Sequence, residues 1–149
     1  MTSDIPENSL ARGILYLWSA TIAADAAYSQ EELNCLVDLA AGNDTIKQYS
    51  KDSIRGVFRE AVELIRTSGA DAMFRRIQSL FKNVNPKTRS HVFYTCLHLV
   101  SIDRNIANRE IMLLRQAYHA LGISPDDAFR LAMVFLQKII ASLHEQRKS

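Results

Sequence analysis

Glycine and proline are scarce in this chain, which has only five and three of them among 149 residues. Both residues interrupt helices, and glycine also serves the tight turns of β-structure. The sequence also lacks stretches in which polar and apolar residues alternate, so it does not indicate β-strands. These absences favour an all-α fold in which the few glycines and prolines mark helix ends.

Cysteine is equally rare, and long apolar runs are missing. Cys35 and Cys96 stand apart with no C-x-x-C spacing, so we expect two buried thiols in a reducing compartment and neither a disulfide nor a zinc site. No apolar run approaches the roughly 18 residues that a membrane span requires. The start, MTSDIPENSL, is acidic and polar, unlike a secretory signal. We therefore expect a cytoplasmic protein without a membrane span.

Recognisable catalytic motifs are lacking as well. The four histidines have neither a histidine at i+4 nor a carboxylate at a zinc-ligand spacing, and no serine or cysteine lies in a nucleophile motif. We interpret His98, inside an apolar stretch, as a hydrogen-bonded core residue. The sequence does not predict an enzyme.

A duplicated pattern is the strongest positive signal. Residues 15–42 and 93–122 each read as two helices joined by a turn, and Asp25 and Glu32 of the first unit align with Asp103 and Glu110 of the second. Both copies follow D-x-x-[YI]-x-x-x-E with apolar helical periodicity on either side. This predicts one compact domain, residues 1–149, with two pseudo-repeated helix-turn-helix units.

About seven helices are expected, bounded by recognisable start and stop residues. They should cover roughly residues 9–25, 29–41, 50–68, 73–83, 85–103, 108–121 and 124–143, with a short helical piece at 46–49. Ser29 and Glu32 form a capping box, and Gly42 should supply a left-handed C-cap. The last helix should turn four apolar residues toward the core: Phe129, Met133, Leu136 and Ile140.

The paired acids admit two interpretations. Asp25 and Asp103 fall at predicted helix C-termini, where the macrodipole disfavours an anion by a few tenths to about 1 kcal/mol. In the structural interpretation each aspartate accepts hydrogen bonds from amides of the next helix. In the functional one, Asp25, Glu32, Asp103 and Glu110 converge on a divalent cation, Ca²⁺ or Mg²⁺, which prefers oxygen ligands.

The doubled pattern resembles the TerB-like family, helical proteins of bacterial tellurite-resistance and stress gene clusters, over roughly residues 10–125. The resemblance implies a compact all-helical fold whose acidic residues form a metal-binding or interaction surface, here Asp25, Glu32, Asp103 and Glu110. The sequence departs from the family pattern in two respects. Ala26 and Arg104 stand where the family has glycine, and Arg109 stands where the first copy has Glu31.

Charge is unevenly distributed along the chain. Residues 1–46 carry a net charge of −6 and residues 47–89 a net charge of +6. The basic block places five bases on two predicted helices: Lys51, Arg55, Arg59, Arg75 and Arg76. They form either a solvated face or a surface that binds an anionic partner. Sequence-specific DNA binding is not expected, because there is no helix-turn-helix or aromatic–basic pattern.

These observations lead to two hypotheses. In the first, the protein is a non-enzymatic accessory or scaffold protein of bacterial tellurite resistance or stress response, has a protein partner and binds a divalent cation at the acidic turns. In the alternative, it is an adaptor that docks an anionic protein or nucleic acid on the basic helical face, and the acidic turns are purely structural.

Overall fold

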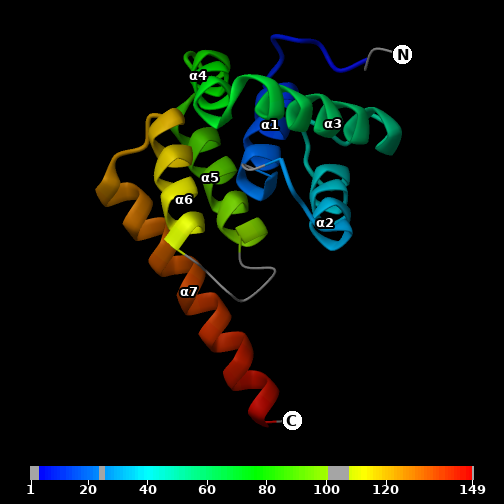
Figure 1. The fold of residues 1–149 in the computed structure, drawn as a ribbon. Helices are drawn as coiled ribbons and strands as arrows, with labels where there is room; N and C mark the ends of the chain where they lie inside the picture. Colours follow the sequence, from blue (N-terminus) through cyan, green and yellow to red (C-terminus); the bar gives the residue numbers. More distant parts are fainter. Residues whose placement is uncertain (1–3, 24–25, 101–107, 149) are drawn as a thin grey trace.

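The chain folds into an all-α structure (Figure 1). The computed structural model describes residues 4–23, 26–100 and 108–148, and within these ranges there are seven helices and no strand. The helices are α1 (Leu10–Ala23), α2 (Gln30–Ala41), α3 (Lys51–Ser68), α4 (Ala70–Leu80), α5 (Pro86–Val100), α6 (Asn108–Ala120) and α7 (Pro125–Lys148). The predicted fold class and number of helices are confirmed.

Helix α1 lies at the centre and contacts α2, α3, α4, α5 and α6. It is apolar around its whole circumference, as a fully surrounded helix must be, and every residue from Ala11 to Ala23 is buried. Two of its few polar side chains bond within the helix: Ser19 Oγ donates to Leu15 O (2.6 Å) and Thr21 Oγ1 to Leu17 O (2.8 Å). Their burial therefore leaves no hydroxyl unsatisfied.

Most helix ends are set by the residues that the sequence indicated. Ser50 caps α3, its side chain accepting from the Ser53 N–H, and Asn85 Oδ1 accepts from the Thr88 N–H (2.8 Å) at the start of α5. Gly122 adopts a φ of 71° after α6, where Ile123 N–H donates to Tyr118 O (2.9 Å). This bond and the positive φ define a Schellman C-cap, for which glycine is the favoured residue.

Two predictions for the connection between α2 and α3 were wrong. Gly42 has a φ of −95° and stays in the right-handed region. The chain continues there into a further turn, because the Gly42 N–H donates to Leu39 O and the Asn43 N–H donates to Ala40 O. The predicted helical piece at 46–49 is instead a run of turns. Ile46 is fully buried there and Tyr49 packs against the core, so this connection is anchored without a helix.

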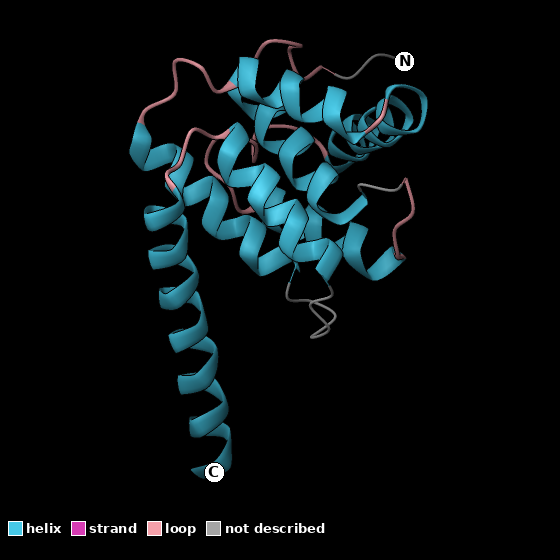
Figure 2. Ribbon diagram, turned by 60° about the vertical axis from the view of Figure 1, so that its left-hand side comes forward, coloured by secondary structure: helices cyan, strands magenta, loops and turns pink. Residues whose placement is uncertain are grey.

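Helix α7 differs most from the prediction. Phe129, Met133, Leu136 and Ile140 do not face the core: they are exposed by 68%, 41%, 45% and 64%. A different face packs against α5, where the buried Phe135 contacts Tyr94. The helix also runs to Lys148 instead of ending near 143, and its C-terminal half extends away from the other helices (Figures 1 and 2).

The two predicted repeat units correspond to the pairs α1–α2 and α5–α6, and the helices of each pair are in contact. Residues 24–25 and 101–107, which include Asp25, Asp103 and Ile106, lie outside the described residues. The superposition of the two turns therefore stays a prediction.

Candidate functional site

The turn between α1 and α2 has an unusual backbone. Ala26 adopts a φ of 64°, and its N–H donates to Ala23 O (2.9 Å). Side chains with a Cβ rarely occupy this left-handed region, which costs them roughly 1–2 kcal/mol. The residue that follows Asp25 in sequence is thus held in a conformation that glycine would adopt without strain, and the family resemblance places glycine at this position.

Glu32 takes part in the predicted capping box, which is confirmed. Its backbone N–H donates to Ser29 Oγ (3.1 Å), and the Ser29 N–H donates to Glu32 Oε1 (2.9 Å). One carboxylate oxygen is therefore engaged at the start of α2. Asp25, Asp103 and the side chain of Glu110 lie outside the described residues. The convergence of the four acids on a cation consequently stays a prediction.

An acidic cleft of about 420 Å³ opens between α2 and α5. It is lined by Glu31, Asn34, Cys35, Asp38, Leu39 and His98. Burial raises the pKa of the Cys35 thiol, and the nearby Asp38 and Glu31 carboxylates raise it further. The thiol therefore stays protonated at neutral pH, which makes it a poor metal ligand and a poor nucleophile.

His98 was predicted to be a core residue and Cys35 a buried thiol, but His98 is exposed and Cys35 is only partly buried, so the core position of His98 was wrong. Glu31 was noted beside the first acidic pair. Cys35 and Asp38 follow it at i+4 and i+7, a spacing that places all three on one face of α2, but nothing in the sequence pairs this face with His98. Among the residues that the structure describes, no group of three or more His, Cys, Asp or Glu side chains could hold a metal ion. The cleft is acidic, but the described residues do not by themselves complete a metal site.

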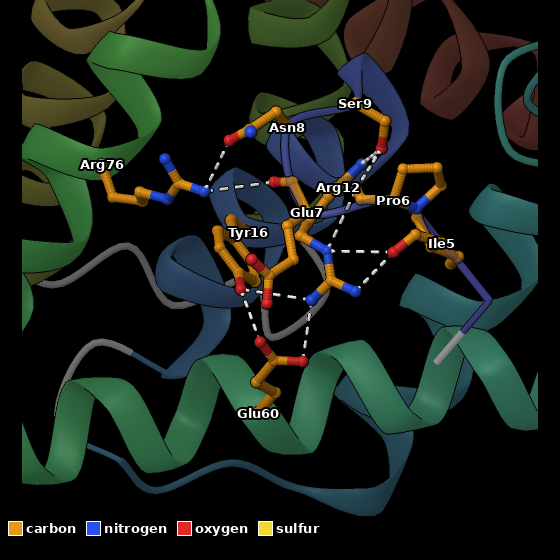
Figure 3. Close-up of polar contacts among 9 residues, drawn as sticks. All are labelled: Ile5, Pro6, Glu7, Asn8, Ser9, Arg12, Tyr16, Glu60 and Arg76. Carbon is orange, nitrogen blue, oxygen red and sulfur yellow. Dashed lines mark hydrogen bonds and ion pairs between the residues drawn. The ribbon is translucent and has the colours of Figure 1, made fainter. Parts of the chain in front are cut away.

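The predicted basic surface divides into free and engaged side chains. Lys51, Arg59 and Arg75 are exposed, and Arg75 lines a groove of about 260 Å³ between α4 and α6. Arg55 lies 3.3 Å from Asp52 in an ion pair. Arg76 Nη2 donates to Glu7 O (3.2 Å) and Asn8 Oδ1 (3.0 Å), so it holds the N-terminal segment (Figure 3).

A buried polar cluster, which sequence analysis missed, surrounds Arg12 (Figure 3). Its guanidinium, only 3% exposed, donates to Ile5 O (2.5 Å) and to Glu60 Oε2 (2.7 Å). The Tyr16 hydroxyl donates to the other carboxylate oxygen of Glu60 (2.9 Å), and burial raises the Tyr16 pKa. In the sequence, Arg12 is the only charged residue of an apolar helix, which indicates that it has a buried partner. That partner, Glu60, is 48 residues away and could not be identified from the sequence. The cluster ties the N-terminal segment to α1 and α3, so its role is structural.

A third cavity, of about 520 Å³, lies between α1, the 42–45 connection and α5. Lys87 and His91 line it from α5, and Asp44 faces them from the connection. Asp44 accepts a hydrogen bond from Lys47 (3.0 Å), which lowers the Asp44 pKa. Charges of both signs therefore meet at this cavity, and it favours neither an anion nor a cation.

Within the described ranges, none of the helices has the length and apolar character needed to cross a lipid bilayer.

The architecture of the described residues is all-α, with a central apolar helix followed by a helix whose first turn is acidic. Comparison with protein families identifies which such domain this is: the family described as "Tellurite resistance protein TerB" matches residues 11–133, most of the chain. The protein belongs to the TerB family. Comparisons with curated proteins and with solved structures found no match.

Proposed function

We propose that the protein is a non-enzymatic accessory or scaffold protein of bacterial tellurite resistance or stress response, and that it binds Ca²⁺ or Mg²⁺ at its acidic turns in the cytoplasm. Membership of the TerB family supports the association with tellurite resistance. The observation that carries the cation site is the left-handed backbone of Ala26, directly after Asp25. Strained backbone of this kind concentrates at ligand-binding sites.

The charges around this turn agree with the proposal. Glu31 and Glu32 stand in the first turn of α2, and Glu31 and Asp38 line the acidic cleft. Carboxylates gathered on one side of a helix repel one another unless a cation lies between them. The non-enzymatic role is supported by the two thiols: burial raises the pKa of Cys96 to about 12 and raises that of Cys35, so neither is an activated nucleophile.

Thermal unfolding tests the cation site. A ligand that binds only the folded state contributes about 2.7 kcal/mol at a hundred times its dissociation constant. For a chain of this size that raises Tm by on the order of 5–11 °C. We expect this rise when Ca²⁺ or Mg²⁺ is added to protein previously treated with a chelator, and its loss in the double variant Asp25→Asn/Asp103→Asn.

The matched control is Asp52→Asn/Asp71→Asn, which removes two first-turn acids of α3 and α4. It should keep the full cation-dependent rise. A wild-type Tm that does not respond to millimolar Ca²⁺ or Mg²⁺ would leave the acids with a structural role only.

A second candidate function is an adaptor that docks an anionic protein or nucleic acid on the basic face of α3 and α4. The exposure of Lys51, Arg59 and Arg75 supports it. No ion pair engages these three side chains within the described part of the chain. Their charges are therefore available to a partner.

A further inference from the structure

Helix α7 carries an apolar stripe that no other part of the described chain covers. The stripe consists of Phe129, Met133, Leu136 and Ile140, each more than 40% exposed. A monomer rarely exposes so many large apolar side chains side by side, and contiguous patches of this kind mark interaction sites.

The spacing of the stripe identifies the kind of surface that fits it. Successive members are four, three and four residues apart, which is the alternation of core positions where two helices wind around each other. The helix has 24 residues and is therefore about 36 Å long. Both its length and its pattern suit another long helix as the occupant.

The same helix is already fixed to its own domain by a different face. Phe135 packs edge-on against Tyr94 of α5, with ring centroids 5.7 Å apart, and Lys138 Nζ lies 5.3 Å from the centre of the Tyr94 ring. Lys138 is the only charged residue between positions 131 and 144, and this contact directs it to α5. The stripe is thus free of charged residues, as the centre of a protein–protein interface usually is.

We propose that the stripe pairs with the same stripe of a second copy of this chain, the two α7 helices running antiparallel. The charges at the helix ends select the direction. Asp126 and Asp127 stand at the start of α7, and the sequence places Arg147 and Lys148 at its end, where they exceed the one acid, Glu145, and leave a net charge of +1. A parallel pair would place like charges beside each other. An antiparallel pair places the acidic start of each helix beside the basic end of the other. It also brings the positive end of each helix dipole next to the negative end of the other.

The shape of the protomer agrees with this pairing. The C-terminal half of α7 extends beyond the other helices (Figure 2), so it can lie along the exposed Phe129 end of the partner's α7 without displacing either domain. Each protomer contributes the same surface, which gives a closed two-fold dimer that does not grow into a filament.

Sedimentation velocity over a concentration series tests the proposal. We expect wild-type protein to form a dimer, and Met133→Glu/Ile140→Glu to sediment as a monomer with at least a tenfold weaker association. Both residues are exposed in the protomer, so its circular dichroism and Tm at low concentration should be retained. The matched control is Val134→Glu/Ala141→Glu, two exposed positions each one residue further along α7, and it should remain dimeric.

Helix direction is tested by spin-label distances between protomers. In an antiparallel pair, labels at position 127 lie more than about 20 Å apart along the axis, from the rise of 1.5 Å per residue, and labels at position 138 lie much closer together. A parallel pair would bring both label pairs together and would overturn the assigned direction.

Three results would overturn the second copy as occupant: a wild type that stays monomeric at all concentrations, equal dimerisation of both double variants, or a monomer whose stripe binds anionic lipid vesicles instead. None of these results bears on the cation site, because α7 contributes none of the four proposed acidic ligands.

Discussion

At the scale of single residues, the burial of Arg12 is the most demanding feature of the described structure. A charge taken out of water is tolerated only when it is paired and its hydrogen bonds are satisfied. The guanidinium meets this condition with the Ile5 and Pro6 carbonyls, the Tyr16 hydroxyl and the Glu60 carboxylate (Figure 3). One side chain thereby joins the N-terminal segment, α1 and α3.

Replacing Arg12 should therefore be costly. We expect Arg12→Met to lower the free energy of unfolding by about 2–3 kcal/mol, because the Ile5 and Pro6 carbonyls lose a buried donor. Glu60 is 47% exposed and can be hydrated, so it adds little to this loss. Urea unfolding measures the change, and limited proteolysis should cut the released N-terminal segment.

The comparison variant is Arg66→Met. Arg66 also forms an ion pair, with Glu63, but on the exposed surface of α3, and its replacement should leave stability nearly unchanged. Equal effects of the two substitutions would show that the Arg12 cluster does not hold the fold together.

At the scale of secondary-structure elements, two places hold residues that their local structure does not favour: the turn between α1 and α2, and the exposed face of α7. Gly122 and Ala26 both have positive φ, of 71° and 64°, but only Gly122 has the residue type that this conformation favours. Helix α7 shows a comparable mismatch, since it is apolar on two faces and its own domain covers only one.

The strain at Ala26 can be measured by relieving it. Glycine removes the roughly 1–2 kcal/mol cost of a Cβ in the left-handed region, at an entropic cost of about 0.4–1 kcal/mol in the unfolded chain. We expect Ala26→Gly to stabilise the protein by about 0.5–1 kcal/mol, raising Tm by roughly 1–4 °C. The neighbouring Ala27→Gly has no such strain to relieve and should lower Tm. A fall in Tm for Ala26→Gly would contradict the assigned backbone.

At the scale of the whole molecule, charge is separated along the chain: the segment 1–46 has a net charge of −6 and the segment 47–89 a net charge of +6. In the structure, acidic side chains of α2 line one cleft, whereas α3 and α4 present exposed bases. A molecule with this distribution attracts cations and anions to different regions. The two candidate functions can therefore be tested independently.

Salt-dependent retention on heparin or duplex DNA tests the basic face. If it binds phosphates, the affinity for DNA should fall with a log–log salt slope of roughly 0.9 per phosphate neutralised. We expect Lys51→Ala/Arg59→Ala/Arg75→Ala to elute at clearly lower salt than the wild type. The control Lys87→Ala/Arg115→Ala/Arg130→Ala removes the same charge from other exposed positions. If the two variants elute at the same salt concentration, retention depends on net charge alone and not on this face.

Much of the fold was predictable because its determinants are local. Such local signals include the scarcity of glycine and proline, the capping box at Ser29, the Asn85–Pro86 start of α5 and the stop at Gly122. The sequence alone therefore determined the seven helices of the described ranges and most of their ends. The duplicated acidic pattern likewise sufficed to indicate the TerB family.

Tertiary structure decided what depends on residues far apart. The partner of Arg12 comes from α3, and His98 reaches the α2 cleft from α5, so neither contact has a signal in local spacing. The face of α7 that is buried also could not be predicted, because Phe129 and Phe135 belong to two apolar faces of similar character. Periodicity shows that a helix has an apolar face, but only the shape of the surface it packs against determines which face is covered.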